Sequence, residues 1–248
     1  MQEVKLKFLE QPLVNSTIRL SLGEPLPVNL AFVFDLARTF QAAGAEEWTV
    51  DDLEALPVAP GTHVNYEPTR INGFRFVNTD GVVVVVSRAL LSVQWDGGPV
   101  QDRGESYAYP GFTSGLLPTL EQLVLAIEDL VGEGSLKFRV SNMSYQFTLG
   151  LDEIFQFIEP FDSKLLNFGA IDNFQLAMRC PDAIEHRITI RPSDASGTQR
   201  IVETAAGIIY PICGFQDAKR NLGDVHNRLL ETFNTILTPY ASEAWKRQ

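Results

Sequence analysis

The stretch Ile71–Val93, INGFRFVNTDGVVVVVSRALLSV, carries the strongest local structural signal in the chain. It contains two runs rich in β-branched and aromatic residues, Ile71–Val77 and Val82–Val93, and each run predicts a strand. Between them, residues 78–81 (NTDG) tolerate positive φ, which a tight hairpin loop requires. The stretch therefore predicts a β-hairpin.

The segment before this hairpin shows one strand pattern and one helix pattern. Leu13–Leu22 is rich in β-branched residues and predicts a strand. Val28–Ala43 has apolar residues at three- and four-residue spacing and predicts an amphipathic helix. The apolar face of this helix is assigned to Leu30, Val33, Phe34, Ala37 and Phe40. Residues 46–68 are polar and contain proline, and Trp48 and Leu53 suggest a short helix within them.

The segment after the hairpin completes an alternating pattern. Pro118–Val131 predicts a second amphipathic helix with proline near its start, and Leu136–Leu149 reads as a further strand. The order β-α-β-β-α-β matches a ferredoxin-like unit, in which helices back one face of an antiparallel sheet.

The second half of the chain is richer in strands and closes with a helix. Strands are predicted at Ile171–Cys180, His186–Arg191 and Arg200–Tyr210, and a helix at Asn221–Leu237. The apolar stripe of that helix is Val225, Leu229, Phe233, Ile236 and Leu237. We expect an α+β protein in which residues 1–248 form one compact unit. It has two lobes of mainly antiparallel sheet backed by helices, approximately residues 1–142 and 143–248.

Composition restricts the class of protein. The 248 residues carry a net charge of −11, which favours solubility and disfavours non-specific binding to duplex DNA. The longest apolar run, Val82–Val86, is too short to cross a bilayer, and Met1–Phe8 lacks the apolar region of a signal peptide. Two isolated cysteines, Cys180 and Cys213, are typical of a reduced protein. We therefore expect an acidic cytoplasmic protein without a membrane partner.

Common catalytic and metal-binding motifs are missing from the sequence. Nucleophile-elbow, phosphate-loop, zincin and dinucleotide motifs are absent, and the histidines, His63, His186 and His226, are far apart. The segment 181–187 (PDAIEHR) superficially resembles a metal-dependent nuclease motif. However, only two residues separate Asp182 from Glu185, and arginine stands where lysine is needed. We expect no cofactor and no metal, and assign no catalytic residue.

Basic residues alternate along several predicted strands, so each group belongs to one side of a sheet. These residues are Lys137, Arg139, Arg187, Arg191, Arg19 and Arg75. One hypothesis is a basic groove, lined further by Tyr145 and Phe147, that holds a nucleotide, a single-stranded nucleic acid or an acidic partner. The alternative is that these bases pair with helix carboxylates or hydrate an open sheet face.

A loop rich in glycine, residues 97–115, contains Tyr107, Tyr109 and Phe112. Aromatic residues are enriched at protein interfaces. These three residues are therefore candidate contacts for a homo-oligomer.

Three segments together resemble a sporadically distributed bacterial family of uncharacterised proteins of about 250 residues. They are Leu9–Val14 (LEQPLV), Gly73–Phe76 (GFRF) with the Asp-Gly hairpin loop that follows, and the histidine-bearing end of the chain from Leu222 to Trp245. The mid-chain strand of that family, R-Y-x-N, corresponds only loosely to RVSN at residues 139–142. The patchy distribution of the family, similar to that of mobile-element, toxin–antitoxin and phage-defence genes, implies an accessory or interaction role.

The leading interpretation is therefore a non-catalytic binding protein, an accessory or neutralising component of a bacterial defence or toxin–antitoxin-type system. Its expected partner is a protein. One alternative is an enzyme acting on nucleotides or nucleic acid with dispersed catalytic residues, so enzymatic activity stays open. A second alternative is a homo-oligomeric scaffold.

Overall fold

The computed structural model describes most of the chain between residues 13 and 240. The described residues are 13–43, 49–55, 71–78, 80–97, 109–150, 154, 156, 174–179, 182–193 and 199–240. Their strands are hydrogen-bonded in the order β2-β3-β4-β5-β1-β6-β9-β8-β7. Helices and an antiparallel sheet thus combine in one chain, which confirms the α+β class.

The chain divides into two compact units. The larger unit comprises Thr17–Asn142 and Ile208–Leu222, and the smaller unit comprises Met1–Ser16, Met143–Gly207 and Gly223–Gln248. Elements β1, β6, β9 and α5 have residues in both units. The predicted lobes, residues 1–142 and 143–248, stay a prediction.

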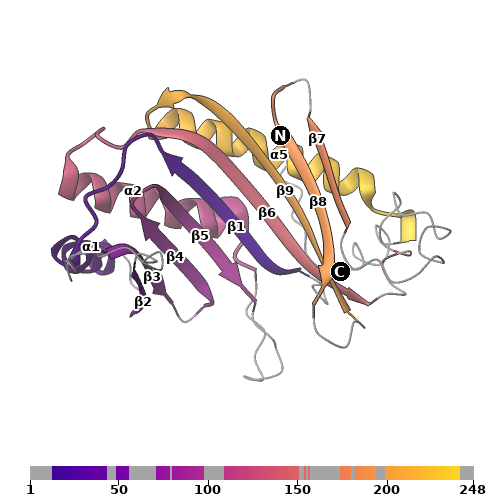
Figure 1. Cartoon of the computed structure of the whole chain (residues 1–248), viewed down its shortest axis with the longest axis horizontal. Coiled ribbons are helices and arrows are strands. Elements are labelled where there is room, and N and C mark those ends of the chain that lie inside the picture. The colour runs from indigo at the N-terminus through magenta and orange to yellow at the C-terminus, as the bar shows by residue number, and fades with distance from the viewer. Residues whose placement is uncertain are drawn as a thin grey trace, which may run out of the picture. The chain divides into compact units, whose positions relative to one another are not determined.

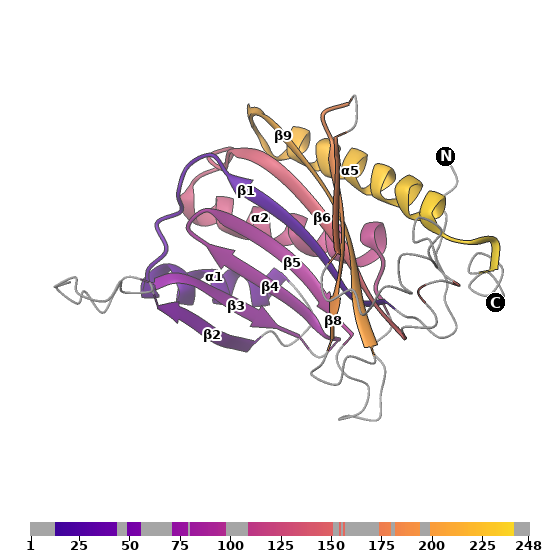
Figure 2. The ribbon, with the colours of Figure 1, turned by 45° about the vertical axis from the view of Figure 1, so that its right-hand side comes forward.

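The larger unit contains an antiparallel meander of β2 (Thr49–Ala55), β3 (Ile71–Val77), β4 (Val82–Ser87) and β5 (Leu90–Asp96). Figure 2 shows these strands side by side in chain order. The β3–β4 turn is the hairpin that the sequence predicted. The Asn78 side-chain oxygen accepts hydrogen bonds from the backbone N–H groups of residues 80 and 82. Gly81 takes a φ of 75°, which suits glycine.

The predicted strand Val82–Val93 is two strands, because a turn interrupts it after Ser87. The Ser87 hydroxyl donates to the Leu90 carbonyl and accepts from the Ala89 N–H, so the chain reverses within a few residues. The short helix expected within residues 46–68 is also wrong at Thr49–Ala55, which forms β2. Four strands therefore stand between α1 and α2 instead of two, and the ferredoxin-like order is not confirmed.

Helices α1 (Leu30–Ala43) and α2 (Leu117–Val131) cover one face of this meander, and they contact each other (Figure 1). Asn29 caps α1 by accepting the N–H of Phe32 at 2.9 Å. A π-helical turn, η1 (Phe112–Leu116), leads into α2. Glycine ends α2 at residue 132, where φ is 109° and the N–H bonds the Glu128 carbonyl.

The apolar face predicted for α1 is partly wrong. Phe34 is 70% exposed and Leu30 is also exposed, whereas Phe32 and Leu36 are buried with Phe40. The Phe32 ring packs edge-on against Phe74 of β3, and the Phe40 ring lies 5.6 Å from that of Phe76. Because α1 packs against both the sheet and α2, its buried face is set by two partners rather than by one stripe.

Two further strands have residues in the larger unit. β1 (Leu13–Leu22) lies beside β5, since the Ser92 hydroxyl donates to the Ile18 carbonyl at 3.0 Å. β6 (Phe138–Gly150) begins next to the end of β1, where the Gly23 N–H bonds the carbonyl of Lys137. These bonds hold the first residues of β6 in place.

The smaller unit contains β7 (Phe174–Arg179), β8 (Glu185–Pro192), most of β9 (Gln199–Cys213) and most of α5 (Phe215–Ile236). β7 and β9 pair with β8 in antiparallel register. The apolar stripe predicted for the closing helix is confirmed. All of its members are buried: Val225, Leu229, Phe233, Ile236 and Leu237.

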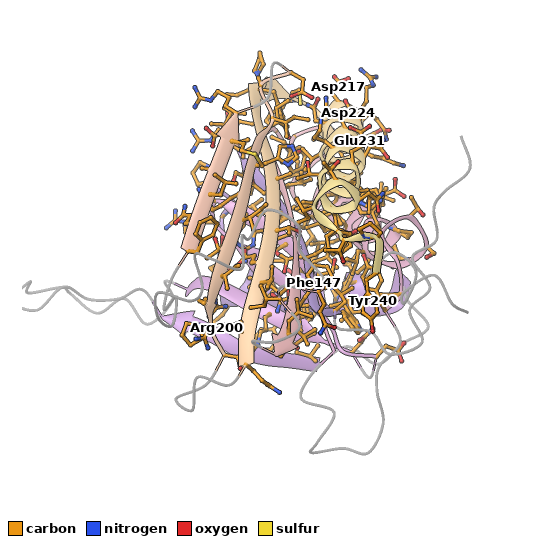
Figure 3. The ribbon with its side chains drawn as sticks, turned by 90° about the vertical axis from the view of Figure 1, so that its right-hand side faces the viewer. Phe147, Arg200, Asp217, Asp224, Glu231 and Tyr240 are labelled. Atoms are coloured by element: carbon orange, nitrogen blue, oxygen red, sulfur yellow. The ribbon has the colours of Figure 1, made fainter. Side chains whose placement is uncertain are left out.

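The outer face of α5 carries acidic side chains and its inner face carries apolar ones, as Figure 3 shows for the acidic residues. Asp217, Asp224 and Glu231 recur every seven residues and point away from the strands. On the inner face, the ring of Phe233 stacks on that of Phe147 of β6 at 4.8 Å. The helix is therefore held by apolar packing and faces solvent with its acids.

Candidate functional site

Arg187 and Arg191 of β8 lie on the exposed face of the strands of the smaller unit. Arg187 pairs with Ala177 of β7 and Ala205 of β9, so it rises between small side chains. Among the described carboxylates, none forms a direct ion pair with either arginine. The same face also carries an Arg179–Glu185 ion pair at 2.7 Å. Its charges are therefore of both signs, not uniformly basic.

The remaining predicted bases are in the larger unit and are spread out. Arg19, Arg75 and Arg139 are exposed. Arg75 of β3 and Arg19 of β1 are separated by β4 and β5, which at ~4.8 Å per strand spacing places their backbones about 14 Å apart. Lys137 is half-buried and donates to the Gly134 carbonyl at 2.8 Å.

Tyr145 and Phe147 do not line an open groove, contrary to the hypothesis. Both side chains are buried on the face of β6 that α5 covers. The Tyr145 hydroxyl lies 3.3 Å from Nδ1 of His226 on that helix. A local irregularity near the start of β6 explains the difference, because Phe138 and Ser141 are both buried although strict alternation would separate them.

The aromatic interface predicted for residues 107–112 is partly contradicted. Phe112 is buried at the start of η1, so it belongs to the core and offers no contact surface. Tyr109 is half-buried and its ring packs edge-on against Trp95 at 5.3 Å. Tyr107 lies outside the described residues. The sequence around an aromatic residue after a glycine-rich loop does not show whether its side chain is buried in the core or exposed at the surface.

The structure exposes a feature that the sequence reading missed, the end of β9. The register of β8 on β9 stops at the pair Glu185–Gly207, but β9 continues to Cys213. Over Ile208–Cys213, no described strand pairs on the side where β8 pairs earlier. Ile209 is 77% exposed and Ile212 is 62% exposed. We call Ile208–Cys213 the β9 end.

Proline at position 211 indicates which backbone groups of the β9 end face outward. Proline has no N–H, so within a sheet it occupies positions whose N–H would point away from the neighbouring strand. Because these directions alternate along an antiparallel strand, Ile209 and Cys213 direct their N–H and C=O groups the same way as Pro211. This proline was the one available sequence signal for a free strand edge.

The β9 end is held firmly from its inner side. The hydroxyl oxygens of Tyr210 and Ser141 lie 2.9 Å apart, and the Ser141 hydroxyl also donates to the Ala218 carbonyl of α5. Burial raises the pKa of Tyr210 to about 12, so its hydroxyl keeps its proton at neutral pH. Burial also raises the pKa of the Cys213 thiol, which makes it a poor nucleophile.

A second polar cluster lies under α5 within the smaller unit. The His186 side chain is 2% exposed, and its Nδ1 lies 3.1 Å from the Thr232 hydroxyl. Burial lowers the pKa of His186, and the nearby Arg228 guanidinium lowers it further, so the ring is neutral at pH 7. Arg228 joins α5 to the turn before β8 through Asp182 at 2.6 Å. This arrangement closes the histidine off from solvent.

No protein-family model and no curated protein matches the chain. Within the described residues, no group of three or more His, Cys, Asp or Glu side chains could hold a metal ion. None of the described helices has both the length and the apolar composition needed to cross a bilayer.

Proposed function

We propose that this chain is a non-catalytic binding protein of the cytoplasm that recognises another protein. The observation that carries the proposal is the β9 end, where Ile209 and Ile212 are largely exposed on a strand anchored from beneath. Exposed apolar side chains on a strand edge that no described strand pairs are typical of contact surfaces. The resemblance to a patchily distributed bacterial family supports an accessory or neutralising role in a defence or toxin–antitoxin-type system.

Recovery of a partner from the native host tests this proposal. The full chain and an Ile209→Asp/Ile212→Asp double variant serve as baits, and we expect the wild type to enrich a protein that the variant loses. Leu125→Asp is the control, because Leu125 is an apolar residue on α2 that is 62% exposed, the same as Ile212. Identical partners on wild type and double variant would contradict the proposal.

A second candidate function is binding of a nucleotide or single-stranded nucleic acid at the exposed face of β8. The exposure of Arg187 between two alanines favours it, since a phosphate could approach that guanidinium closely. Oligonucleotide binding at low salt should then weaken in Arg187→Ala/Arg191→Ala and stay unchanged in Arg38→Ala, whose arginine lies on α1. No binding of the wild type at low salt would exclude this candidate.

A further inference from the structure

We infer that the outer edge of the β9 end binds an extended segment of the partner protein as an added strand. The inference rests on the proposed function and specifies how the same surface works. Strand addition uses main-chain hydrogen bonds for affinity and alternate side chains for specificity. The β9 end provides a backbone edge on which no described strand pairs beyond Gly207, and two exposed isoleucines, Ile209 and Ile212, which lie on opposite faces of the strand because they are three residues apart.

The edge is ordered before any partner arrives. Tyr210 and Ser141 bond beneath it, and the ring of Phe138 at the start of β6 packs 5.9 Å from that of Phe215 at the start of α5. A segment that binds here therefore meets a strand already in extended geometry. The cost of ordering falls on the incoming segment alone.

The size of the edge favours a short segment as its occupant. The β9 end is six residues long, about 20 Å of strand. Stable interfaces between folded proteins use about 20 to 30 residues per side. A second copy of this chain is also disfavoured by charge, because each copy carries a net charge of −11. An extended apolar segment of a different protein fits both the length of the edge and the negative charge of this chain.

Pro211 makes the edge selective. The outward groups are the N–H and C=O of Ile209, the C=O of Pro211, and the N–H and C=O of Cys213, by the alternation argued above. A segment paired here loses the one bond that an N–H at position 211 would donate. Proline at an edge also discourages indiscriminate strand pairing. The incoming segment should carry a β-branched apolar residue where it meets Ile209.

A peptide selection on the full chain tests the inference. A phage library of random twelve-residue peptides is selected against the wild type and counter-selected against Ile209→Asp/Ile212→Asp. Selected peptides are synthesised with single N-methyl groups at each position. We expect methylation at alternate positions to weaken binding about tenfold or more, and methylation at the positions between them to have little effect.

Two substitutions at position 209 of this protein test the same backbone hydrogen bonds. Ile209→Pro removes an outward N–H, whereas Ile209→Thr keeps it and keeps a β-branched side chain. We expect Ile209→Pro to weaken peptide binding much more than Ile209→Thr, and hydrogen exchange to show protection of residues 209 and 213 by bound peptide. Because Ile209→Pro could unfold the strand end, the N-methyl pattern decides independently.

The outcomes separate this inference from the proposed function. Equal sensitivity to N-methylation at all positions, or protection outside the β9 end, would overturn strand addition. Loss of a host partner in the aspartate double variant would still support a binding function at this surface. Failure to select any peptide that prefers the wild type would overturn the inference as well.

Discussion

The two halves of β9 have the same kind of sequence but opposite environments. Over Arg200–Gly207 the strand pairs residue by residue with β8, and Val202 and Ala206 are buried. Over Ile208–Cys213 it continues with apolar residues, yet Ile209 is the most exposed large apolar residue in the described part of the chain. Two causes combine: Ile209 lies on the face of β9 opposite to Val202 and Ala206, where the preceding residues are only half-buried, and β8 begins at Glu185 and reaches no further along β9.

This contrast shows that an apolar strand pattern does not by itself state which residues are core. The length of the neighbouring strand and the position of α5 decide it. The half of β9 that β8 pairs with, Arg200–Gly207, is called the covered half, and the β9 end is called the uncovered half. The stability of the fold should be sensitive to substitutions in the covered half and its surroundings. It should tolerate substitutions in the uncovered half when no partner is bound. Four predictions test that difference, from the largest expected effect to the smallest.

The strongest test removes the packing of α5. Phe233→Ala deletes the buried ring that stacks on Phe147, and we expect it to lower the free energy of unfolding by about 3–5 kcal/mol. Urea unfolding measures the effect, with Asp224→Ala on the exposed face of the same helix as control. A decrease in the free energy of unfolding below about 1 kcal/mol would mean that the packing of α5 on β6 does not stabilise the fold.

The second test concerns a hydroxyl in the covered half. The Oγ1 atom of Thr204 is buried, and no described group forms a hydrogen bond with it. Thr204→Val replaces the hydroxyl by a methyl group of similar size, so we expect stabilisation of about 1 kcal/mol. Thr204→Ser keeps the hydroxyl and should not stabilise. Destabilisation by valine, measured by thermal unfolding, would contradict the prediction.

The third test uses pH. The pKa of His186 is lowered in the folded state by burial and Arg228, although Asp182 and Glu231 act in the opposite direction. Below about pH 6.5 the unfolded chain binds the proton more readily, so the free energy of unfolding should fall as pH falls through that value. This dependence should be weaker in His186→Gln. An equal slope in wild type and His186→Gln would contradict it.

The smallest effect is expected at the uncovered half. Ile209→Thr should change the free energy of unfolding by no more than about 0.5 kcal/mol, since the side chain is largely in solvent already. The same substitution at Ile188, which is buried on β8, should cost several times more because it buries a hydroxyl. Equal costs at the two positions would show that the β9 end is covered in solution.

Local patterns alone determined much of this protein. The hairpin around residues 78–81 and the stripe of α5 were predicted correctly. So were the strands around His186–Arg191 and Arg200–Tyr210. Each of these depends on neighbours in sequence or on one repeating period, so the information lies within the segment itself.

The tertiary structure alone decided where those patterns meet. α1 buries Phe32 and Leu36 rather than Leu30 and Phe34, because two partners contact it. The bases on the strands are distributed over both units, and the candidate site lies instead at the β9 end. That site exists because β9 extends beyond the end of β8. The relative lengths of two neighbouring strands are set by packing, not by composition.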